Sequence, residues 1–168
     1  MNKFLLITLT TVFWGNLIFA QSVWITRKID NKLSLKFPEE PKEIKPGSFL
    51  ASSADKGTLF VFSIIDTKQI GYDSVEFESV KVTDSFLKNF KSGIKQSLSG
   101  FEIDDIKTDQ WHNLTTYIIT GVNPQGTKID YLAIVIGAKI YALVTRRNKG
   151  IGTEDRDIYF KSVEYTLK

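Results

Sequence analysis

Cysteine is absent from the 168-residue chain, and histidine occurs once, as His112. Without a thiol the protein has no disulfide bond, no thiolate metal ligand and no thiol nucleophile. It also lacks the lipid-modified cysteine that anchors bacterial lipoproteins. One imidazole leaves only carboxylates as further ligands, so we expect no metal site and no cofactor. Stability must come from packing alone.

The chain also lacks the patterns that usually mark catalysis. No Gly-x-Ser-x-Gly elbow is present to supply a serine nucleophile for His112. The acidic clusters at 104–109 and 154–157 do not have the spacing of a calcium loop. Two enzymatic hypotheses stay open: a hydrolase or isomerase that uses His112, or one that uses an Asp/Glu pair brought together by folding.

The one long apolar run lies at the N-terminus, where Phe4 to Ala20 follow Lys3. A positive start, an apolar centre and Ile18-Phe19-Ala20 before Gln21 are typical of a secretory signal peptide at residues 1–20. The alternative is an uncleaved membrane anchor, for which the run has about the minimum length. We therefore predict one domain over residues 21–168, exported to the periplasm or the extracellular space.

Charge of one sign is also scarce. One of the 22 Lys and Arg side chains, Lys3, lies in the predicted signal peptide, whereas none of the 19 acids does, so the remainder carries a formal charge of +2. A nucleic-acid-binding protein normally concentrates basic residues on one face, and we expect no nucleic-acid partner. A cysteine-free exported domain is more typical of a bacterial envelope than of the disulfide-rich eukaryotic extracellular space.

Apolar patterning predicts an α+β fold whose antiparallel sheet consists of the N-terminal hairpins and a following meander. The expected strands are 23–29, 32–37, 48–54, 58–65, 101–111, 113–122, 127–136, 139–145 and an edge strand in 163–167. Prolines mark residues 38–47 as a connection without a strand. Gly57 is expected to supply the positive φ of the 55–57 loop, and Gly137-Ala138 predicts a type II′ hairpin. Because several strands are apolar on both sides, helices should cover both faces of the sheet.

Two helical regions are predicted. An apolar stripe recurs every four residues over 83–98, at Phe86, Phe90, Ile94 and Leu98. This spacing is typical of an amphipathic helix, which Thr83 or Asp84 can cap. Residues 73–76 resemble a capping box and predict an earlier helical segment, with a break before Thr83. A short helix over 153–162 is expected to cover the other face.

The most basic local feature supplies a hypothetical binding surface. We expect Arg146 and Arg147, with nearby Trp111 and His112, to contact an anionic lipid, a polysaccharide or an acidic partner. The lysines of the long helix, Lys88, Lys91 and Lys95, could meet the same ligands, but such a stripe is more often an ordinary solvated face.

Two short segments carry a family resemblance. The opening Leu35-Lys36-Phe37-Pro38-Glu39-Glu40-Pro41, the closing Tyr159-Phe160-Lys161-Ser162-Val163 and the order of elements between them resemble the PsbP-like family over about Ile29 to Lys168. The resemblance implies an α/β/α sandwich. The family includes extrinsic photosystem subunits, a nuclear-import factor that binds a small GTPase, and many exported bacterial proteins. It has no common active site, so no functional residue is carried over.

Together these features predict an exported, non-enzymatic binding or assembly domain of the cell envelope. Its partner is expected to be a protein or another envelope component. Contact with the membrane is expected only through the N-terminal segment. If that segment stayed uncleaved, the chain would be a membrane-tethered assembly factor.

Overall fold

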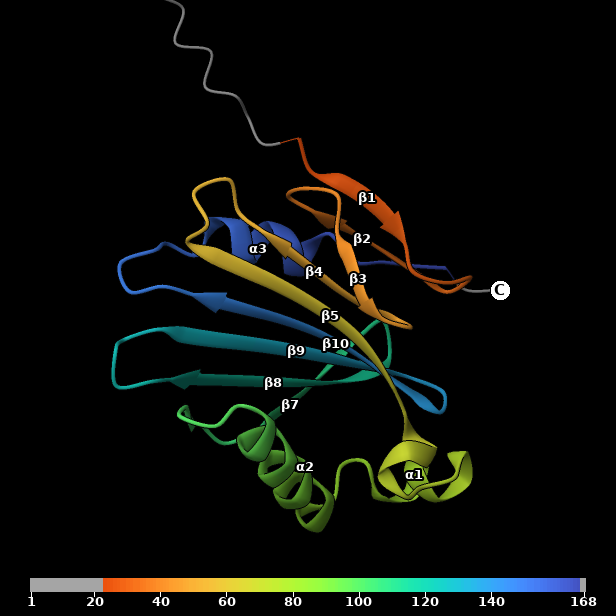
Figure 1. Ribbon diagram of the computed structural model, residues 1–168. Helices are drawn as coiled ribbons and strands as arrows, with labels where there is room; N and C mark the ends of the chain where they lie inside the picture. Colours follow the sequence, from red (N-terminus) through yellow and green to blue (C-terminus); the bar gives the residue numbers. More distant parts are fainter. Residues whose placement is uncertain (1–22, 167–168) are drawn as a thin grey trace, which may run out of the picture.

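The computed structural model describes residues 23–166, so the predicted signal peptide lies outside the described residues. The fold has three layers, and Figure 1 shows the main antiparallel sheet between α1 and α2 on one side and α3 on the other. The predicted α+β sandwich with helices on both faces is confirmed. Within residues 23–166, no helix combines the length and the apolar character needed to cross a membrane.

The main sheet has eight strands, all paired antiparallel. Seven follow the order β3-β4-β5-β10-β9-β8-β6, and β7 pairs with β8 beside β6. Their bounds are β3 Lys42–Lys45, β4 Ser48–Ser52, β5 Thr58–Asp66, β6 Glu102–Ile103, β7 Lys107–Trp111, β8 Leu114–Val122, β9 Lys128–Ile136 and β10 Lys139–Arg147. The central pair β5 and β10 is in register over nine residues, from Lys139 opposite Asp66 to Arg147 opposite Thr58. Gly137, at φ +60, begins the β9–β10 turn as predicted.

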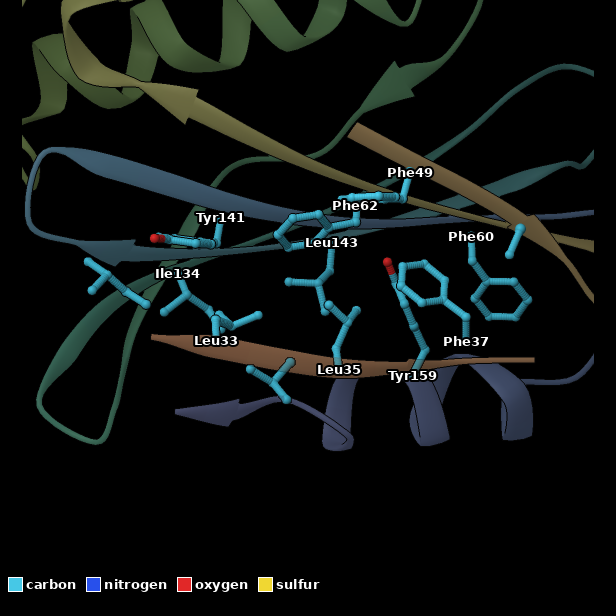
Figure 2. Close-up of a cluster of buried hydrophobic side chains, with 13 residues drawn as sticks. Leu33, Leu35, Phe37, Phe49, Phe60, Phe62, Ile134, Tyr141, Leu143 and Tyr159 are labelled. Atoms are coloured by element: carbon cyan, nitrogen blue, oxygen red, sulfur yellow. The ribbon is translucent and has the colours of Figure 1, made fainter. Parts of the chain in front are cut away.

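A second, three-stranded sheet covers one face together with α3 (Glu154–Lys161). It consists of β1 (Ile25–Lys28), β2 (Leu33–Phe37) and β11 (Glu164–Tyr165), in the order β1-β2-β11. The strict alternation of β2 buries Leu33, Leu35 and Phe37 against the main sheet (Figure 2). The N-terminal hairpin therefore forms part of the cover and does not extend the main sheet. We call this side the α3 face.

Three helical segments lie on the opposite side, which we call the α2 face. They are the 3₁₀ helix η1 (Thr67–Ile70), α1 (Ser74–Val80) and α2 (Asp84–Ser97). Asp73 caps α1 by accepting hydrogen bonds from the amides of Val75 and Glu76. Thr83 caps α2, so the predicted cap and the predicted break between the helices are both confirmed. The apolar stripe of α2 packs on β8, β9 and β10.

Three predictions about strands were wrong. Residues 38–47 do contain a strand, β3, which lies at the sheet edge, where flanking prolines leave the pairing with β4 intact. The predicted strand 101–111 is interrupted after Ile103, so that β6 and β7 each pair with part of β8. The α2-side residues of β5, among them Leu59 and Val61, stay half-buried, because the helices pack over β8 to β10.

The loop between β4 and β5 needs glycine for a reason other than the predicted one. Lys56, and not Gly57, takes the positive φ, at +55. A Cβ at Gly57 would lie 2.8 Å from Cδ1 of Ile151, and the Gly57 carbonyl accepts a hydrogen bond from the amide of Asn148. Gly57 is therefore required by the close approach of the loop that leads to α3.

Candidate functional site

A half-open cleft of about 440 Å³ lies between α2, η1 and the sheet. We call it the α2 cleft. Its lining residues are Ile65, Ile70, Tyr72, Phe86, Asn89, Phe90, Gly93, Ile94, Ser97 and Tyr131. The volume falls within the range of about 300–1,000 Å³ that is typical of small-molecule sites. The lining is mainly aliphatic and aromatic, which is also typical of such sites.

Polar contacts connect the elements around the cleft to the rest of the fold. The Asp66 side chain accepts from the amide of Lys68 and begins η1, whose last residue, Ile70, lines the cleft. Deep in the α2 face, the Tyr117 hydroxyl donates to the carbonyl of Lys81 at 2.8 Å. This bond attaches the turn between α1 and α2 to β8. In the middle of α2, the Lys91 ammonium lies 2.7 Å from a carboxylate oxygen of Asp105, in the connection between β6 and β7.

Aromatic rings form the deep wall. Phe86 and Phe90, one helical turn apart, stack at 5.6 Å with an angle of 14° between their planes. Tyr72 meets Phe86 edge-on at 5.8 Å, and Tyr131 of β9 meets Phe90 edge-on at 6.4 Å. Such offset and edge-on pairs are favourable ring geometries, so the wall is held in place by its own contacts.

The predicted binding residues Trp111 and His112 do not contribute to this cleft. His112 lies in the turn between β7 and β8 with φ +50, next to Asn113 at φ +61. Its ring is edge-on to that of Trp111 at 4.5 Å, and His112 is exposed. Trp111 also approaches Tyr165 of β11, at 6.4 Å.

Arg147 is buried and serves the fold. Its Nε and Nη2 donate to Oδ2 of the buried Asp130, at 3.1 and 2.9 Å, and its Nη1 donates to the carbonyls of Ile151 and Gly152. Arg156 of α3 donates to the other oxygen of Asp130 at 3.0 Å. This network attaches α3 and its preceding loop to β9 and β10, which leaves Arg147 unsuited to contact a partner.

Arg146 is exposed and points to the α2 face, with its guanidinium 6.0 Å from the centre of the Phe101 ring. The structure does not bring it near Trp111 or His112. The β7–β8 turn lies at the sheet end marked by Lys139, seven residues from Arg146 along β10, which is about 23 Å at 3.3 Å per residue. The proximity assumed for the four predicted residues was therefore wrong.

The acidic residues of α3 meet different partners. The Arg156 guanidinium holds the pKa of Asp157 below its usual range. Burial, and then the nearby carboxylates of Asp55 and Glu154, raise the pKa of Asp155. Over residues 23–166, no group of three or more Asp, Glu or His side chains has the arrangement of a metal site.

Sequence reasoning did not find the α2 cleft because it assigned Phe86, Phe90 and Ile94 to an ordinary core stripe. One signal was available. Gly93 lies inside α2, where glycine costs about 1 kcal/mol relative to alanine. In the structure a Cβ at Gly93 would meet no atom within 4 Å, and Gly93 lines the cleft. A glycine within a helical pattern often has a packing or functional reason.

Comparison with known proteins gives a fold match only. No family model and no curated protein sequence matches the chain. The solution structure of cyanobacterial PsbP from Synechocystis sp. PCC 6803 is similar, with a TM-score of 0.60 and 9% identity over 86% of this chain and 94% of that one. A crystal structure from Bacteroides thetaiotaomicron gives a TM-score of 0.45 at 13% identity, covering 81% of this chain and 46% of that one. The match to cyanobacterial PsbP shows that the chain has a PsbP-like fold.

Proposed function

We propose that this protein is an exported, non-enzymatic binding domain of the cell envelope, and that the α2 cleft is its binding site. The observation that carries the proposal is the cleft itself, a preformed apolar site with a few polar groups. Its lining residues offer no carboxylate, imidazole or ammonium group, which favours binding over acid–base catalysis there. The N-terminal sequence pattern supports export.

The binding claim can be tested with variants on one helix. Leucine in place of Gly93 would add a bulky side chain to the lining of the α2 cleft, whereas leucine in place of the neighbouring exposed Ser92, which does not line the cleft, is the matched control. Wild-type protein, Gly93→Leu and Ser92→Leu are incubated with a bacterial envelope extract, and the retained molecules are compared by mass spectrometry. We expect the wild type and Ser92→Leu to retain a common molecule that Gly93→Leu does not. Equal retention by all three would show that the cleft is not the site.

The export claim needs a separate measurement. The full-length chain is expressed in a Gram-negative host, and the N-terminus of the recovered protein is sequenced. A chain that begins at Gln21 in the periplasmic fraction would support the proposal. A chain that keeps Met1 in the membrane fraction would instead support the membrane-tethered assembly factor.

A further inference from the structure

Tyr131 presents a polar group to the α2 cleft without a protein partner. The residue is 93% buried, with 7% of its surface exposed. Within residues 23–166 its hydroxyl makes no hydrogen bond, whereas the hydroxyls of Tyr117, Tyr141 and Tyr159 all donate one. Within the described residues, the side-chain oxygens that are fully buried and unpaired are those of Ser48, Thr58 and Thr67. The Tyr131 oxygen is not one of them, so it keeps access to the cleft that Tyr131 lines.

Because the cleft is half-open, water can accept a hydrogen bond from this hydroxyl in the free protein. A ligand oxygen that accepts from Tyr131 would take the place of that water and keep the hydroxyl paired when the cleft is filled. Burial raises the pKa of Tyr131 well above its ordinary value, so the hydroxyl stays protonated and remains a donor.

The cleft is long in one direction. Phe86, Phe90, Gly93 and Ser97 line it from α2, and they recur at successive turns of the helix. Eleven residues of α-helix separate the first from the last, which is about 16 Å at 1.5 Å per residue. A chain-like ligand lying along α2 would contact all four, whereas a compact ligand would leave part of the groove empty.

The chemistry of the lining also limits the charge of the ligand. No Lys, Arg, Asp or Glu is among the lining residues. A carboxylate or ammonium group placed beside Tyr131 would therefore lose its hydration without gaining a counter-charge, which is strongly unfavourable.

From these observations we infer that the α2 cleft binds an elongated, uncharged molecule of the lipid type. Its hydrocarbon chain lies along α2, and one neutral oxygen accepts a hydrogen bond from Tyr131. This inference rests on the proposed function, because it assigns a ligand class to the same cleft.

The inference can be tested with two probes of the same chain length, decanol and decanoate. Each is titrated into ¹⁵N-labelled residues 21–168 at pH 8, where decanoate is ionised, and amide shifts are followed by NMR. We expect decanol to shift amides of η1, α2 and β9 with saturation, and to bind about tenfold more tightly than decanoate, because only the acid brings a charge into the apolar cleft.

Tyr131→Phe tests the role of the hydroxyl. We expect decanol to bind this variant roughly three- to tenfold more weakly than the wild type, the usual effect of one lost hydrogen bond. Thermal stability should be unchanged or raised, since no hydrogen bond within the protein is removed. Gly93→Leu should abolish the shifts, and Ser92→Leu should preserve them.

The outcomes separate the two proposals. If decanol binds in the cleft but Tyr131→Phe binds it equally well, or decanoate binds as tightly, the inferred ligand class is wrong and the proposed binding site stands. If the shifts map to another surface, or Gly93→Leu binds decanol like the wild type, both proposals are wrong.

Discussion

The two faces of the main sheet are covered in different ways. On the α3 face, a strand hairpin and a helix together seal the core, and Leu35, Phe37 and Tyr159 are fully buried (Figure 2). On the α2 face, the helical segments η1, α1 and α2 cover the central strands, and they leave a half-open cleft beside Tyr131. A sheet apolar on both sides needs two covers, but the covers need not be equally complete. One face can hold the fold together while the other keeps room for a ligand.

Buried tyrosines show the same contrast. On the α3 face, Tyr159 donates to the carbonyl of Val61 at 3.1 Å and Tyr141 donates to Asp30 at 2.6 Å. On the α2 face, Tyr117 is paired with a backbone carbonyl, but Tyr131 is left for the cleft. Paired hydroxyls stabilise the fold, whereas an unpaired one is an available contact.

Truncating Tyr159 should produce the largest effect. We expect Tyr159→Ala to lower the free energy of unfolding by about 3–5 kcal/mol, the range for a fully buried aromatic ring. Phe90→Ala, on the half-open side, should lower it by only about 1–2 kcal/mol, because that ring is partly exposed already. Urea unfolding of both variants measures the difference. Equal losses of unfolding free energy in the two variants would contradict the claim that the α3 face is sealed and the α2 face is half-open.

Arg147 and Arg146 are adjacent in sequence but should respond very differently. Arg147→Ala removes the closest partner of buried Asp130, although Arg156 still pairs with its other oxygen, and we expect the free energy of unfolding to fall by about 3 kcal/mol. Arg146→Ala removes only an exposed contact with Phe101 and should lower the free energy of unfolding by less than about 1 kcal/mol. Thermal and urea unfolding of the pair test this. A larger loss for Arg146→Ala would mean that the ion network does not hold α3 as described.

The sequence predicted most of the fold because its elements carry strong local signals. The alternation in 32–37, the stripe of α2 and the Thr83 cap depend only on neighbouring residues, and each was confirmed. The edge strand β3 was missed because its residues are all exposed and show no alternation. Whether the N-terminal hairpin joins the main sheet or covers it depends on long-range pairing with β11, which no local pattern encodes.

The candidate site was much less predictable than the fold. Adjacent Arg146 and Arg147 look equivalent in sequence, but successive strand residues point to opposite faces, and only Arg147 meets Asp130. Trp111 and His112 were assumed to be near them, although a nine-residue strand separates the two ends of the sheet. The α2 cleft requires Tyr131 of β9 and Ile70 of η1 to meet α2, a juxtaposition that only the tertiary fold reveals.

Acid should weaken the α3 face through Asp30. Burial raises the pKa of this carboxyl, but hydrogen bonds from Tyr141 and from the amides of Lys32 and Leu33 outweigh it and hold the pKa below the ordinary value. In the unfolded chain the pKa of an Asp carboxyl is about 3.9. A lower pKa in the folded protein stabilises the fold at pH values above about 3.9, and this stabilisation is lost as the pH falls through the folded-state pKa. The wild type should therefore exceed Asp30→Asn in stability at pH 7, and the gap should close below about pH 4. Urea unfolding across this pH range measures it. A gap that does not change with pH would contradict the assignment.

The smallest expected effect is a gain of stability on the α2 face. Gly93→Ala adds a Cβ that meets nothing within 4 Å in a helix, and it should raise the free energy of unfolding by up to about 1 kcal/mol. Gly100→Ala is the matched control. Gly100 has φ +90 after the end of α2, so alanine there should be destabilising. Thermal unfolding of the two variants compares them. If Gly93→Ala were as damaging as Gly100→Ala, the open space beside α2 would be absent.

The most direct test of the difference between the faces is a fluorescence titration with N-phenyl-naphthylamine, an uncharged apolar dye, on folded residues 21–168. We expect saturable binding of one dye per chain, which Gly93→Leu abolishes and Ser92→Leu leaves intact. Undiminished binding by Gly93→Leu, with the variant shown to be folded, would contradict the claim that the α2 face holds the binding site.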